Sequence, residues 1–293
     1  MALGFISSDA GLLLLQASVV AAPRTPPRWR WAARLRGPAW ALVPISSIVG
    51  VVFAIRFLSD TATGLTYLAL VAVPPLAAVA LAWAARPEGR LTVLRVLSAL
   101  VVTAVLFAIA TGSGHSLGPE ASAAILSALA CVTLGVLLAA VAPPKWLKLG
   151  ILGMAAADVW LVASDLLQSP NTLLVRAQPA PFLGAHLPRL QSEVFGSVNM
   201  GFGDLFIAAV LGAVLAASGR TQWPAALLTL VLAGLFDLLF LVVDELPATV
   251  PVALALLVIE GWGRWSVARP GRLRRAVRWR SVEPRSDRAG AAP

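Results

Sequence analysis

The chain has 293 residues, a mean hydropathy of +0.84, only 13% charged residues and a formal net charge of +9. A soluble domain keeps about a quarter of its residues charged, so this composition argues against a soluble globular protein and favours one whose solvent is lipid. The positive charge does not indicate nucleic-acid binding, because the basic residues are confined to short stretches between apolar runs and to the C-terminus. Cys131 is the only cysteine, and His115 and His186 are the only histidines. An internal disulfide and a thiolate metal site are therefore excluded, and we expect neither a metal nor a cofactor.

Nine apolar runs approach the length of about 20 residues that a membrane helix needs. We therefore expect an all-α, multi-pass bundle of about nine transmembrane helices in a cell membrane. Proline and glycine mark most of the joins, and Pro74-Pro75 inside the third run is expected to kink it. The first run could instead be a cleaved signal peptide, although it lacks a basic n-region and carries Asp9. The expected spans are about residues 4–22, 39–58, 66–84, 93–111, 122–142, 146–167, 199–217, 223–243 and 247–262.

Basic residues gather in alternate joins between the expected spans. The odd-numbered joins and the tail hold most of them, whereas the sixth join is mixed. Since basic joins remain in the cytoplasm, this alternation places the N-terminus outside and the C-terminus in the cytoplasm, and it requires an odd number of spans. The basic residues of the first join are Arg24, Arg28, Arg30, Arg34 and Arg36.

The expected spans divide the chain into three parts. Residues 1–145 hold about five N-terminal spans, residues 146–265 hold about four spans with the candidate catalytic residues, and residues 266–293 form a basic tail. We expect the tail to be disordered in the cytoplasm and to touch anionic lipid. The long external join, about residues 168–198, is expected to lie on the membrane surface or to act as a gate.

Ionisable side chains within membrane spans are costly and mark candidate functional sites. Those near span ends can reach the interface; they are Asp9, Arg56, Arg95 and Glu260. The others lie deeper in their spans, and they are Asp158, Asp165, Asp204 and Asp237.

Asp204 ends the string Gly201-Phe202-Gly203-Asp204 at the start of the seventh run. The two glycines permit unusual backbone angles and close approach of another chain. Hydrolysis by aspartates needs two carboxyl groups that share one proton, so a second aspartate must lie at the same depth. At ~1.5 Å per residue, Asp204 lies roughly 20 Å and Asp158 roughly 18 Å from the cytoplasmic ends of their spans. Asp165 lies roughly 28 Å along the sixth span; it is the alternative partner.

These residues resemble a known pattern. An aspartate in the sixth span, Gly-Phe-Gly-Asp at the seventh, and Pro247-Ala248-Thr249 at the ninth are similar to the GxGD intramembrane aspartyl proteases, signal peptide peptidase and presenilin. The resemblance covers roughly residues 146–262, and the span count and outside N-terminus match signal peptide peptidase. It implies that Asp158 and Asp204 are the catalytic pair. It also implies that Gly201, Phe202 and Gly203 shape the active-site helix, that Pro247 to Thr249 support it, and that the substrate is a transmembrane or signal-peptide helix.

Two positions depart from the pattern of that family. Ala157 replaces the tyrosine that precedes the first aspartate, and Thr249 replaces the leucine of the ninth-span Pro-Ala-Leu motif. These departures leave open a non-catalytic membrane scaffold with a protease-like fold.

Two other functions also stay open. Prepilin peptidases use Gly-x-Gly-Asp too, but here Leu205-Phe206 follows the motif and a cytoplasmic cysteine cluster is absent from the sequence. The mid-membrane carboxyl groups, Asp237 among them, could instead carry protons or cations in a transporter, although no internal repeat is evident. The sequence does not identify a particular substrate or an oligomeric state.

Overall fold

The computed structural model of the protein describes residues 2–25, 46, 50, 61–84, 92–112, 117–164, 173, 177, 179–181, 186–196, 198–241 and 246–267. Met1–Leu257 form one compact unit and Val258–Pro293 form a second. The packing discussed below lies within the first unit. The expected second span (39–58), apart from residues 46 and 50, lies outside the described residues, as do Asp165 and positions 268–293 of the expected tail.

The described part is all-α in class, with eight α-helices, as expected from the apolar runs. A two-stranded antiparallel sheet, which was not predicted from the sequence, precedes α8, and its second strand takes up the first residues of the expected seventh span (199–217), so the helix there begins only at Phe202. A short 3-10 helix, η3 (Leu238–Leu241), extends α9. The helices are α1 (Ala2–Ala21), α3 (Thr61–Ala84), α4 (Val93–Ala110), α5 (Leu117–Val141), α6 (Pro144–Ala163), α8 (Phe202–Ala217), α9 (Trp223–Asp237) and α10 (Val250–Val267), and the strands are β1 (Ser192–Phe195) and β2 (Val198–Gly201).

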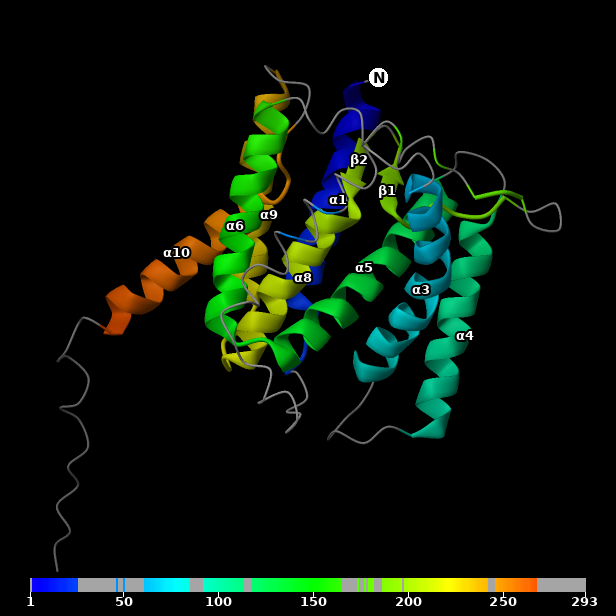
Figure 1. Cartoon of the computed structure of the whole chain (residues 1–293), viewed down its shortest axis with the longest axis horizontal. Coiled ribbons are helices and arrows are strands. Elements are labelled where there is room, and N and C mark those ends of the chain that lie inside the picture. The colour runs from blue at the N-terminus through cyan, green and yellow to red at the C-terminus, as the bar shows by residue number, and fades with distance from the viewer. Residues whose placement is uncertain are drawn as a thin grey trace, which may run out of the picture. The chain divides into compact units, whose positions relative to one another are not determined.

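Helix α8 is the central helix of the first unit. It packs on α1, α5 and α6 (Figure 1), and every residue from Ile207 to Ala216 is buried. A helix that is apolar all round is stable only when other helices or lipid surround it. Small residues of α8 and α5 allow close packing, because a Cβ added at Gly135 of α5 would lie 2.8 Å from the backbone carbonyl of Ala209.

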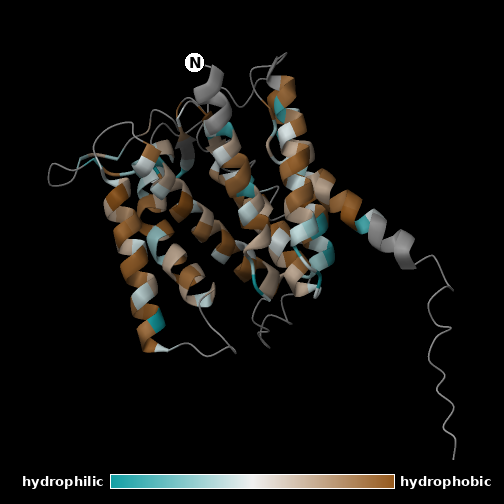
Figure 2. Cartoon of the chain, turned by 180° about the vertical axis from the view of Figure 1, so that it is seen from behind, coloured by the Kyte–Doolittle hydropathy of each residue, from teal (hydrophilic) through white to brown (hydrophobic). Residues whose placement is uncertain are grey.

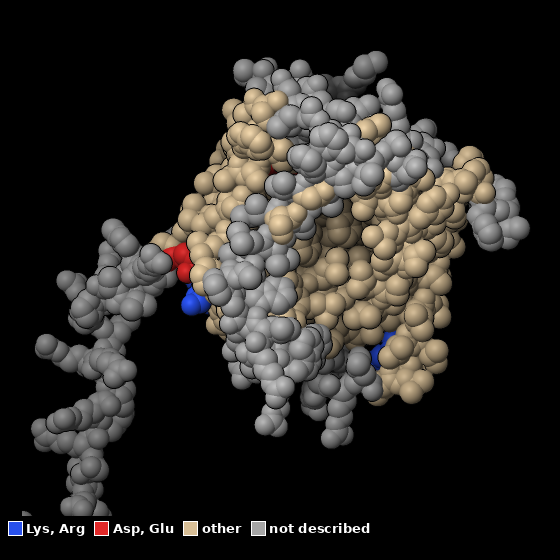
Figure 3. Space-filling view, viewed as in Figure 1, with Lys and Arg blue, Asp and Glu red and all other residues tan. Residues whose placement is uncertain are grey.

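The outer helices present apolar side chains to their surroundings. In α4, Val93, Leu94, Val101 and Val105 are each more than half exposed, and Figure 2 shows hydrophobic residues along most of the length of the helices. On the face in Figure 3, almost all of the described surface is neither acidic nor basic. Apolar surface of this extent is typical of contact with lipid.

Four helices in the described part are long and apolar enough to cross a membrane, and these are α3, α4, α5 and α6. The protein is therefore a multi-pass membrane protein. The full count of nine spans and the orientation stay predictions.

Two contacts bring together joins that the charge pattern assigns to one side of the membrane. Glu120, at the start of α5, accepts a hydrogen bond of 2.7 Å from the backbone N–H of Gly196 in the long join before α8. Beyond the C-terminal ends of α1 and α8, the side-chain amide of Gln222 donates a hydrogen bond to the carbonyl of Pro23. The fourth and sixth joins thus contact each other, as do the first and seventh.

Replacing Gly135 with alanine tests the close packing of α5 on α8. Because the new Cβ would press on the Ala209 backbone, Gly135→Ala should destabilise the fold by about 1–3 kcal/mol. Gly234→Ala in α9 is the matched control, since no described atom would lie within 4 Å of its Cβ. The measurement is thermal unfolding in detergent, followed by circular dichroism. Equal unfolding temperatures for the two variants would contradict the proposed packing.

Candidate functional site

Asp204 lies in the first turn of α8, where the strand β2 gives way to the helix. Gly201 is the N-cap residue, with φ −73 and ψ 145. Its backbone N–H donates to Oδ2 of Asp204 at 3.1 Å, which is the reciprocal bond of a capping box. The start of α8 therefore fixes the position of the Asp204 carboxyl group.

The residues around Asp204 have separate structural roles. Phe202 packs against a cluster of α3, α5 and the segment before β1 that includes Val73, Leu126 and Leu190, which anchors the beginning of α8. Gly203 has no described atom within 4 Å of where its Cβ would lie. The φ of Gly201, −73°, is one that any residue can adopt, so the unusual backbone angles that the sequence suggested are not found at this glycine.

Asp158 lies on α6, and its carboxyl group meets the segment that begins α10. The Thr249 hydroxyl donates to Oδ2 of Asp158 at 2.7 Å, and the Thr249 backbone N–H lies 3.5 Å from the same oxygen. Thr249 is 2% exposed. Since its carbonyl accepts the first backbone bond of α10, from Ala253 at 3.1 Å, Asp158 lies at the positive end of that helix dipole.

The Pro247-Ala248-Thr249 segment is held from a second side by α1. The buried Gln16 donates from Nε2 to the Ala248 carbonyl at 3.1 Å, and Gln16 itself is 1% exposed. Gln16 is not among the candidates expected from the sequence, because those were ionisable residues. An amide in an apolar span is also costly unless it is hydrogen-bonded, and that rule would have singled it out.

The two candidate aspartates lie on α6 and α8, which pack on each other. The charge of Asp158 acts on Asp204. Asp165, the alternative partner, lies outside the described residues. Of the site residues expected from the sequence, Asp158, Asp204 and Thr249 thus form one connected group around the N-termini of α8 and α10.

Asp237, which the sequence left without a role, is paired with Asp9. Helix α1 packs on α9, and the carboxyl groups of Asp9 and Asp237 are within hydrogen-bond reach of each other. Two carboxyl groups can share a hydrogen bond only when one of them carries a proton. Asp9 was assigned to the membrane interface from its place near a span end, so this pairing was missed.

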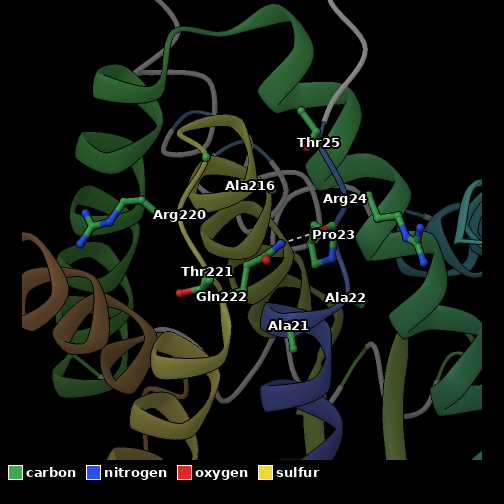
Figure 4. A pocket seen from close by; sticks show the side chains of 10 residues that line it. Ala21, Ala22, Pro23, Arg24, Thr25, Ala216, Arg220, Thr221 and Gln222 are labelled. Atoms are coloured by element: carbon green, nitrogen blue, oxygen red, sulfur yellow. Dashed lines mark hydrogen bonds between the residues drawn. The ribbon is translucent and has the colours of Figure 1, made fainter. Parts of the chain in front are cut away.

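A cavity of about 590 Å³ lies at the far end of these helices and contains neither candidate aspartate. It is formed by the end of α1 and the loop between α8 and α9, and Figure 4 shows the hydrogen bond from Gln222 to Pro23 across it. The side chains of Arg24 and Arg220 point away from each other in that view. The cavity therefore has no part in the candidate catalytic group.

The described residues hold no group of three or more His, Cys, Asp and Glu side chains that could bind a metal ion. Comparison of the chain with protein-family models, with curated proteins and with solved structures finds no match.

Proposed function

We propose that the protein is an intramembrane aspartyl endopeptidase that cleaves transmembrane or signal-peptide helices with Asp158 and Asp204. The observation that carries the proposal is the contact of Thr249 with Asp158, together with the electrostatic interaction of Asp158 and Asp204. Three sequence segments that resemble one protease family, though more than 40 residues apart along the chain, converge on one pair of carboxyl groups.

The chemistry that we propose needs only the pair and one water molecule. The carboxylate takes a proton from water, the water oxygen attacks the carbonyl carbon of the substrate peptide, and the protonated partner donates its proton to the carbonyl oxygen. Collapse of the tetrahedral intermediate breaks the C–N bond, and the amide nitrogen leaves with a proton returned by the pair.

Two features beside Asp204 support a peptide substrate. No described atom lies within 4 Å of where a Cβ at Gly203 would be, so the residue before Asp204 leaves room for a chain. The two-stranded sheet ends at Gly201, three residues before Asp204, and among the described residues each strand has one edge without a strand partner. An unwound segment of a substrate helix needs new partners for its backbone groups in lipid, and a strand edge supplies them.

Replacing either aspartate with asparagine should abolish hydrolysis. Asparagine keeps the size of the side chain but cannot exchange the proton, so Asp158→Asn and Asp204→Asn should each lower kcat by at least about 100-fold. The measurement is cleavage of a fluorescence-quenched peptide with one membrane-spanning helix by purified protein in liposomes.

Asp237→Asn is the matched control, because it changes another carboxyl group of the bundle that lies in a separate pair. It should keep its cleavage rate. Full cleavage by Asp204→Asn, with both variants folded and inserted, would rule the protease out.

A second function, proton- or cation-coupled transport, is favoured by one separate observation. Asp9 and Asp237 form a carboxyl pair between α1 and α9, and Oδ2 of Asp237 is buried without a hydrogen-bond partner among the described residues. Such a pair can take up and release a proton within a helix bundle.

Transport predicts the opposite pattern of mutant effects. Asp237→Asn should abolish pH-driven acidification of liposomes loaded with a pH-sensitive dye, because the pair then holds one titratable group, whereas Asp204→Asn should leave the acidification unchanged. Wild-type liposomes that show no flux above that of protein-free liposomes would remove this alternative.

A further inference from the structure

Thr249 is the N-cap residue of α10, but its hydroxyl group does not make the usual hydrogen bond to the helix backbone. As the N-cap residue, a threonine normally accepts a hydrogen bond from the backbone N–H two or three residues on. Here the residue two positions on is Pro251, which has no N–H, and the Thr249 hydroxyl instead donates to Asp158 on α6. The hydroxyl group therefore donates its hydrogen bond to a carboxyl group on another helix, α6.

The direction of this hydrogen bond constrains Asp158. Its Oδ2 accepts the Thr249 hydroxyl at 2.7 Å and faces the Thr249 N–H at 3.5 Å, while Oδ1 receives no hydrogen bond from the described residues. A hydroxyl that donates to a carboxyl oxygen favours the charged form of that carboxyl group, whose negative charge is shared by both oxygens. The other oxygen, Oδ1, is then available to take a proton from water.

The surroundings of Asp204 differ from those of Asp158. Its described donor is one backbone N–H, from Gly201 at 3.1 Å, within its own helix turn. Asp158 has a side-chain hydroxyl donor and the start of a second helix opposite it. The asymmetry gives the two carboxyl groups different tasks.

We infer that Thr249 is a positioning residue that holds Asp158 as the carboxylate which activates water, so that Asp204 carries the proton given to the substrate. This inference rests on the proposed protease function. It also assigns to Thr249 a task that depends on its hydroxyl group and not on its bulk.

The test compares Thr249→Ser with Thr249→Ala. Both variants remove the methyl group, but only serine keeps the hydroxyl. With the fluorescence-quenched helical peptide in liposomes, Thr249→Ala should lower kcat by about 10-fold or more, the amount expected for a hydrogen bond to a charged group. Thr249→Ser should keep kcat within about 3-fold of wild type, and KM should change by less than about 2-fold in both, because the substrate itself does not touch the hydroxyl.

Thr229→Ala is the control for loss of a buried threonine. Thr229 of α9 is fully buried, and its hydroxyl has no hydrogen-bond partner among the described residues, so the variant should cleave at the wild-type rate. Equal kcat values for Thr249→Ser and Thr249→Ala in an active protein would overturn the inference alone. A wild-type protein that does not cleave the peptide would overturn the proposed function and the inference together.

Discussion

A carboxyl group inside an apolar helix bundle must find hydrogen-bond donors, and in this protein the beginnings of two helices supply them. The first N–H groups of a helix have no partner within it, and the helix dipole favours negative charge there. Asp204 uses the N-terminus of its own helix, α8. Asp158 lies in the C-terminal half of α6 and uses the N-terminus of α10 through Thr249. The positions at which α8 and α10 begin therefore determine where the two carboxyl groups lie.

The buried position of α8 extends this constraint to the first half of the chain. Helix α8 packs on α1 and α5 as well as on α6. Residues outside the segment that resembles the proteases, about 146–262, therefore also hold the candidate site in place. Gln16 of α1 fixes the Ala248 carbonyl, and the Cys131 thiol of α5 contacts the Phe202 carbonyl at 3.7 Å. The N-terminal helices thus help to hold the candidate site in place. From the sequence, only their apolar character was apparent, and no residue in them was expected to contact the site.

The sequence predicted the helices well because about 20 consecutive apolar residues have few other stable forms in lipid. It also selected Asp158 and Asp204, since charge within an apolar run is conspicuous. It did not predict the contacts of Gln16 or Thr249, because uncharged polar side chains barely alter a hydropathy average. The sheet was missed because its strands have four residues each. The sequence signal for the hairpin was the glycine in the two-residue connection between Phe195 and Val198, because tight hairpin turns need positive φ angles. That glycine, Gly196, has a φ of +62°.

The two departures from the protease pattern, Ala157 and Thr249, can be interpreted together in the light of the contacts. At the two positions concerned, that pattern has one hydroxyl group, on the tyrosine before the first aspartate; this chain also has one, on Thr249. Ala157 and Thr249 taken separately favour a scaffold without activity, but Thr249 donates to Asp158 itself. A scaffold also has no need of two interacting carboxyl groups, because a buried carboxyl group is costly unless it is hydrogen-bonded or paired. The protease that we propose uses both the carboxyl pair and the hydroxyl bound to one of its members, whereas a scaffold requires neither.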